Sequence, residues 1–111
     1  MQTVCMAVSD IQATEADLAR EKRFAEQAKA LSHPVRVRIL KMLHQLDNYG
    51  VCLNGDLVAE LGLAQSTVSE HLRILKNAEL VIAESNPPRT CYRIHRQNLA
   101  GFQALFGDLF G

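Results

Sequence analysis

The sequence predicts one mainly helical domain that carries a small β-hairpin near its carboxyl end. Its 111 residues suffice for one compact core and leave too little length for a second. With no Trp, two Tyr and four Phe, the interior is left to aliphatic side chains, which suit packed helices better than a large sandwich. The expected order of elements is α-α-(short β)-α-α-β-β-α, with residues 1–13 as a flexible tail and residues 14–111 as the domain.

The first two helices follow the tail. Apolar positions recur on one side of residues 14–31, and Thr14 is placed to cap the amino end. Ser32-His33-Pro34 then interrupts the pattern, because Ser32 can accept hydrogen bonds from free backbone amides and Pro34 suits a first helical turn. We expect the second helix to run to about Gln45.

Two further helices lie close together in the middle of the chain. Val51-Cys52-Leu53 is too brief for a helix and suits a small strand, and Asn54 is a cap candidate for a helix through Leu61. Gly62 ends that helix as a left-handed cap would. The next helix runs from Gln65 to about Leu80. Its apolar residues recur at intervals of four and three on one face: Val68, Leu72, Leu75 and Ala78.

A hairpin and a last helix complete the chain. Residues 80–84 and 90–95 alternate as β-strands do, and the two prolines of the connection predict a stiff tip. Residues 98–110 place Leu99, Phe102, Phe106 and Leu109 at helical spacing with almost no charge. A partner subunit is the economical place to bury that face; the alternative is that the helix folds back onto its own core.

Two short helices joined by a tight turn and followed by a hairpin make a winged helix-turn-helix, whose second helix enters the major groove of DNA. Small polar side chains at the start of that helix permit close approach to phosphates and base edges. The predicted DNA-binding residues are Gln65, Ser66, Thr67, Ser69, His71 and Arg73 on the helix and Arg89 on the hairpin. Ser66 and Thr67 have local capping as an alternative role.

The local distribution of charge supports binding to duplex DNA better than the net charge does. The formal net charge is zero, but acids crowd the first quarter of the chain and bases outnumber acids in the second half. One face can therefore meet phosphates while the whole molecule stays neutral. Ordinary solvated charges are the alternative interpretation.

Three stretches together resemble the ArsR/SmtB metalloregulators: LSHPVRVRIL, GDLVAELGLAQSTVSEHLRILKNAELV and a hairpin ending in CYRI. The resemblance covers about Ala25 to His95. It implies a homodimer formed through the first and last helices, and a repressor that binds operator DNA and releases it when an effector binds. Because the chain has no apolar run of about 18 residues and no basic leader before an apolar stretch, we expect it in the cytoplasm.

The sequence lacks the best-known metal sites of that family. The arsenic and cadmium sensors often carry Cys-x-Cys before Asp-Leu, where this chain has Leu53 and Gly55. The zinc and nickel sensors use Asp and His along the last helix, which here holds no His and only Asp108.

Three cysteines remain as candidate ligands: Cys5, Cys52 and Cys91. Three thiolates suit As(III) or Sb(III), and soft thiolates also suit Cd(II) or Pb(II). Each cysteine also has an interpretation without a ligand role. Cys52 and Cys91 would be buried apolar residues, and Cys5 would lie in a disordered tail. A redox-responsive thiol pair, or a regulator with another effector or none, stays open.

Two other classes of function are weaker. A thiol enzyme is disfavoured because no Gly-rich anion loop precedes a helix, no Cys-x-x-Cys is present and a chain this small has little room for a concave substrate site. A winged helix that binds protein instead of DNA is the other alternative, for which the near-zero net charge is a modest argument. We expect a regulator that is not an enzyme and needs no cofactor to fold.

Overall fold

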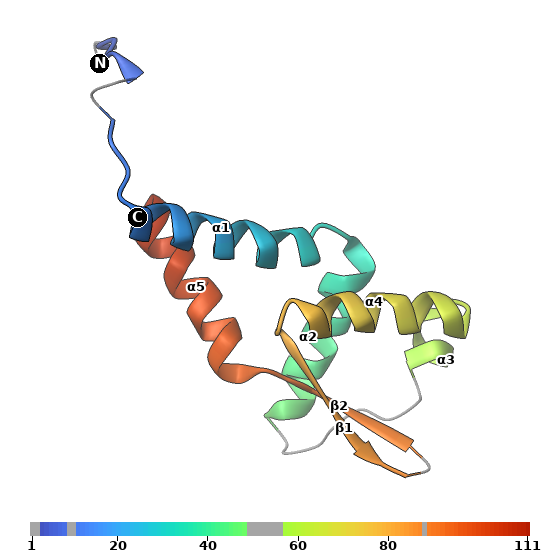
Figure 1. The fold of residues 1–111 in the computed structure, drawn as a ribbon. Helices are drawn as coiled ribbons and strands as arrows, with labels where there is room; N and C mark the ends of the chain where they lie inside the picture. Colours follow the sequence, from blue (N-terminus) through green and yellow to red (C-terminus); the bar gives the residue numbers. More distant parts are fainter. Residues whose placement is uncertain (1–2, 9–10, 49–56, 88) are drawn as a thin grey trace.

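The computed structural model describes residues 3–8, 11–48, 57–87 and 89–111. The described residues form a mainly helical winged helix-turn-helix, which confirms the expected fold class, with α1 and α5 side by side at one end (Figure 1). The elements are α1 (Glu15–Ala30), α2 (Pro34–Asp47), α3 (Leu57–Leu61), α4 (Gln65–Asn77), β1 (Val81–Asn86), β2 (Arg89–Ile94) and α5 (Arg96–Phe110). The short strand expected at residues 51–53 and the cap expected at Asn54 lie outside the described residues.

The first two helices begin at side-chain caps. The Oγ1 of Thr14 accepts from the N–H of Asp17 at 3.1 Å, and the Asp17 carboxylate accepts from the N–H of Thr14 at 2.9 Å, so a reciprocal capping box starts α1. The expectation that Ser32 caps α2 is wrong. His33 immediately precedes Pro34, and its Nδ1 accepts from the N–H of Val35, whereas the Ser32 hydroxyl donates back to a carbonyl of α1.

The core joins α4 to α2 and to the hairpin. The side chains of Ile39, Leu75 and Leu80 are completely buried. Each such aliphatic side chain contributes roughly 2 kcal/mol through removal from water. The buried stripe of α4 consists of Val68, Leu72 and Leu75, as its spacing predicts. This packing fixes which face of α4 is left for solvent.

The chain leaves α3 and α4 through left-handed residues. Gly62 has a φ of 66°, which confirms the expected glycine cap. Glu79 has a φ of 62° and turns the chain away from the helix axis, so α4 ends at Asn77 and not at Leu80. The Leu80 amide then donates to the carbonyl of Leu75 at 3.0 Å and delivers the chain into β1.

The wing is longer than the alternation of residue types predicts. β1 and β2 pair antiparallel from Val81↔Ile94 to Asn86↔Arg89, so the ladder continues beyond the expected strand end at Glu84. The positions that this adds to the expected strands are Ser85, Asn86 and Arg89. All three are polar, so no alternation of polar and apolar residue types marks them in the sequence.

The last helix packs on the first through aromatic rings. Phe24 of α1 stacks on Phe102 of α5 with ring centroids 4.9 Å apart and meets Phe106 and Phe110 at 5.9 Å. No residue of α5 is fully buried, and Phe106 and Phe110 remain 56% and 69% exposed. The apolar face of α5 is therefore only partly covered within one chain. None of the described helices is long and apolar enough to cross a membrane.

Candidate DNA-binding surface

The start of α4 presents a row of small polar side chains. Gln65, Ser66, Thr67 and Ser69 are all exposed, and the first turn of the helix contains no carboxylate. The residue that caps α4 is Ala64, which makes no side-chain hydrogen bond to the helix. The alternative role of Ser66 and Thr67 as caps is therefore wrong, because neither hydroxyl caps the helix.

Arg73 lies one turn after Ser69 and is held by a carboxylate of the same helix. Its Nε donates to Oε2 of Glu70 at 2.9 Å, and its side chain remains 58% exposed. This hydrogen bond raises the pKa of Arg73 and lowers the pKa of Glu70. Both groups stay charged, and an exposed guanidinium can exchange a carboxylate partner for a phosphate.

His71 does not belong to this surface, which corrects the sequence-based expectation. Only 8% of it is exposed, and its ring lies 4.4 Å from that of His33. Its Nδ1 lies 3.2 Å from Nη1 of Arg36. A guanidinium can only donate, so Nδ1 accepts and the neutral ring carries its proton on Nε2. Burial, followed by the charges of His33 and Arg36, lowers the pKa of His71.

Arg36 has a structural role that sequence reasoning missed. Its Nε donates to the carbonyl of Ala30 at 2.6 Å, at the end of α1, while its Nη1 donates to His71 of α4. The residue itself stands in the first turn of α2. One half-buried guanidinium thus fastens three helices and positions the helix that carries the polar row. No local pattern in the sequence indicates this role, because the contact with His71 joins residues 35 positions apart.

The wing adds charge beside the helix-turn-helix. Arg93 on β2 pairs with Glu84 on β1 at 3.4 Å, with both side chains about half exposed. Arg89 begins β2 opposite Asn86, at the outer end of the hairpin. The position of its backbone agrees with a wing role, while the placement of its side chain lies outside what the structure describes.

Of the three candidate thiols, the structure describes Cys5 and Cys91, and these two are not bonded to each other. Cys5 is an exposed free cysteine on the amino-terminal tail, which extends away from α1 in Figure 1. Cys91 lies on β2, is 6% exposed and is part of a disulfide. Cys52 lies outside the described residues. Within the described ranges, no group of three or more His, Cys, Asp or Glu side chains is placed to hold a metal ion.

A helix with a polar outward face, backed by a buried stripe and flanked by a β-wing, defines a DNA-binding regulator of the winged helix-turn-helix class. Residues 33–83 match the model of the bacterial regulatory protein, arsR family. The chain belongs to this family. The matched family and the relatives of this chain are transcriptional regulators, which is the class of function that the sequence predicts.

Individual relatives agree with this assignment. The chain is 42% identical over 81 residues to the HTH-type transcriptional regulator CmtR of Mycobacterium tuberculosis. The aligned region covers 73% of this chain and 65% of that protein. The chain thus matches a little less than two thirds of the length of CmtR.

Two solved structures share the fold. A possible transcriptional regulator for arsenical resistance is 27% identical, with a TM-score of 0.63 over 78% of this chain and 85% of that one. The homodimeric winged helix-turn-helix DNA-binding domain of Mb0332 from Mycobacterium bovis is 26% identical, with a TM-score of 0.63 over 87% of this chain and 86% of that one.

Proposed function

We propose that this chain is a cytoplasmic, homodimeric repressor that binds a palindromic operator and releases it when an effector binds. The observation that carries the proposal is the polar row on α4, formed by Gln65, Ser66, Thr67, Ser69 and Arg73. The helix behind this row is fixed by its buried stripe and by the Arg36 contacts, so the reading side chains are held on a rigid element. Arg89 takes the backbone contact from the wing.

The dimer forms through α1 and α5. Their shared aromatic cluster leaves Phe106 and Phe110 largely exposed, and Leu18 on α1 is 56% exposed as well. Large apolar side chains gathered in this way are typical of a surface that a second subunit covers. The similar Mb0332 domain is homodimeric, which supports a dimer of this chain. In a twofold dimer the two α4 helices read half-sites of opposite orientation.

The DNA-binding proposal is tested by fluorescence anisotropy of the reduced protein on the DNA upstream of its own gene. Arg73→Ala should raise the dissociation constant by about tenfold or more while the dimer persists. Arg20→Ala is a matched control, because Arg20 makes the same kind of exposed i,i+3 ion pair with Asp17 on α1. Duplex affinity that Arg73→Ala leaves unchanged would place the reading face elsewhere.

Salt dependence separates DNA binding from the protein-binding alternative. Affinity for duplex should fall steeply as salt rises, because phosphate contacts release counterions. A winged helix that binds only protein shows no duplex affinity at low salt.

For the effector, we propose a thiophilic metal(loid), arsenite or antimonite first and cadmium or lead second. It is bound by Cys5, Cys52 and Cys91 in the reduced protein, in which the disulfide of Cys91 is open. Support comes from the chemistry of three thiols and from the likeness to a possible regulator for arsenical resistance. Release of operator DNA by arsenite should require all three cysteines, each tested as a Cys→Ser variant. Release that survives the Cys5→Ser change would remove the tail from the site.

A thiol redox response is the second candidate, and one observation favours it: Cys91 takes part in a disulfide. In this case DNA affinity should differ between protein treated with a thiol reductant and protein treated with an oxidant, without any metal. The Cys91→Ser variant should abolish the difference, whereas Cys5→Ser should retain it. Equal affinities of the reduced and oxidised forms would contradict the redox response.

A further inference from the structure

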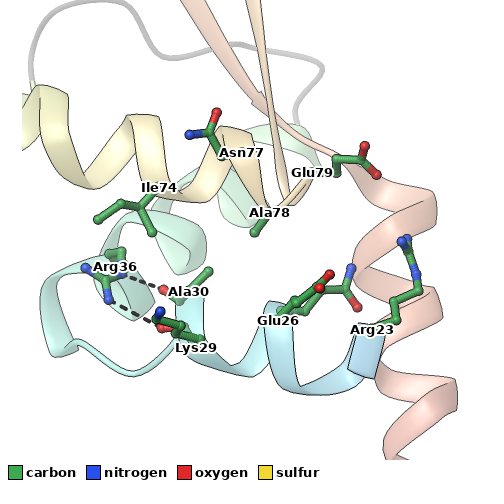
Figure 2. A pocket seen from close by; sticks show the side chains of 10 residues that line it. Arg23, Glu26, Lys29, Ala30, Arg36, Ile74, Asn77, Ala78 and Glu79 are labelled. Carbon is green, nitrogen blue, oxygen red and sulfur yellow. Dashed lines mark hydrogen bonds between the residues drawn. The ribbon is translucent and has the colours of Figure 1, made fainter. Parts of the chain in front are cut away.

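A pocket lies between α1 and the end of α4 (Figure 2). Its volume is about 560 Å³, within the range of small-molecule sites. The wall from α1 includes Arg23 and Glu26, and the wall from α4 includes Ile74 and Asn77. Because α1 also carries the proposed dimer surface, a molecule in this pocket would touch both the dimerisation helix and the DNA-reading helix.

The charged groups of the pocket are of both signs. Arg36 of α2 is one of them, and it donates to a backbone carbonyl of α1. Arg23 and Lys29 supply cations from α1, and Glu26 and Glu79 supply carboxylates. Within the described part of the chain, none of these four side chains makes an ion pair or a hydrogen bond. Cations and carboxylates that line one pocket without pairing with each other favour a ligand that carries both a negative and a positive group.

A buried amide in the same wall also lacks a partner. Gln27 is 3% exposed, and neither its Nε2 nor its Oε1 has a hydrogen-bond partner in the structure. Such a group is unfavourable for the fold, and buried polar atoms are nearly always paired in native proteins. Both polar atoms lie behind the pocket surface, so a bound molecule pairs with the amide when the Gln27 side chain turns toward the pocket.

We propose that this pocket binds a small zwitterion of the amino-acid class. The carboxylate of the ligand lies against Arg23 and Lys29, and its ammonium group lies against Glu26 and Glu79. Ile74 and Ala78 offer an apolar strip of α4 to its side chain. An effector role for this ligand rests on the proposed function. A molecule that contacts both the dimerisation helix and the reading helix would change how this subunit is placed against its partner, and so the spacing of the two reading helices.

The test is isothermal titration calorimetry of the full chain, without DNA, against each of the free amino acids. At least one should bind with a dissociation constant below about 1 mM. Its analogues that lack the carboxylate or the amine should bind at least about tenfold more weakly, because each removes one charged contact. Arg23→Gln and Glu26→Gln should each weaken binding by a similar factor, whereas Lys22→Gln, one residue away and outside the pocket, should have no effect.

The Gln27→Leu variant provides a second readout. It should melt at a temperature equal to or above that of the parent, because an unpaired buried amide is removed, and it should bind the amino acid more weakly. No binding of any amino acid at ~10 mM, or equal binding by Arg23→Gln and Lys22→Gln, would overturn the proposal. The calorimetry contains no DNA, so a failure to bind amino acids would not count against the repressor proposal. Likewise, a failure to bind duplex DNA in the anisotropy experiment would not count against amino-acid binding.

Discussion

Replacing Arg36 by Met tests whether one guanidinium holds the reading helix in place. Met keeps most of the apolar stem and removes the donors. Two contacts are lost: the 2.6 Å bond to the carbonyl of Ala30 and the 3.2 Å bond to Nδ1 of His71. The 3.4 Å contact with the carbonyl of Lys29 is too long to add much. A hydrogen bond with a charged partner contributes about 1.5–3 kcal/mol, and the half-exposed position favours the lower figure.

The expected loss is therefore about 3 kcal/mol in the free energy of unfolding, or roughly 12–20 °C in melting temperature for a domain of this size. The assay is urea unfolding at one fixed protein concentration, because dimerisation makes the midpoint depend on concentration. Arg38→Met is the control: Arg38 is exposed on α2 and makes no ion pair or hydrogen bond within the described residues. A loss that differs by less than about 0.5 kcal/mol between the two variants would refute the reasoning.

Three further outcomes are expected. Because burial lowers the pKa of His71, the unfolded chain takes up a proton more readily, so stability should fall as pH drops below about 6.5; His71→Gln should remove this loss in urea titrations between about pH 7.5 and 5. Phe106→Ser should shift the protein from dimer to monomer in light scattering, while Val37→Ser, an exposed change on α2, should not. Thr14→Ala should lower the free energy of unfolding by about 1 kcal/mol through loss of the capping box, with Thr3→Ala in the tail showing no change. A flat pH profile of the parent, a dimeric Phe106→Ser protein or an unaltered Thr14→Ala protein would contradict these expectations in turn.

Periodicity predicted most of the fold because the buried stripes are regular. Val68, Leu72 and Leu75 follow helical spacing, and the structure buries all three. The same rule also explains the error at His71. This residue comes three positions after Val68 and four before Leu75, which is the spacing of the buried face, so its polarity and not its position suggested exposure.

What sequence reasoning could not reach depends on contacts between distant segments. The bond from Arg36 to His71 joins residues 35 positions apart, and nothing local indicates that these two side chains meet. The pocket beside Gln27 is likewise a product of packing, because its walls come from α1, the start of α2 and the end of α4. The candidate DNA contacts of α4, by contrast, lie in one continuous stretch of the chain and could be proposed from residue type alone.

The Arg36 fastening has a mechanical consequence. Arg36 links α1, α2 and α4 at a single point, so α4 has little freedom to rotate independently. A displacement of α1 therefore moves the reading helix with it as one rigid body. Signals in such a molecule travel as a change in the distance and angle between whole subunits. Amide hydrogen exchange should therefore show the last turn of α1 and the first turns of α2 opening together, in one cooperative step, and Arg36→Met should split that step in two.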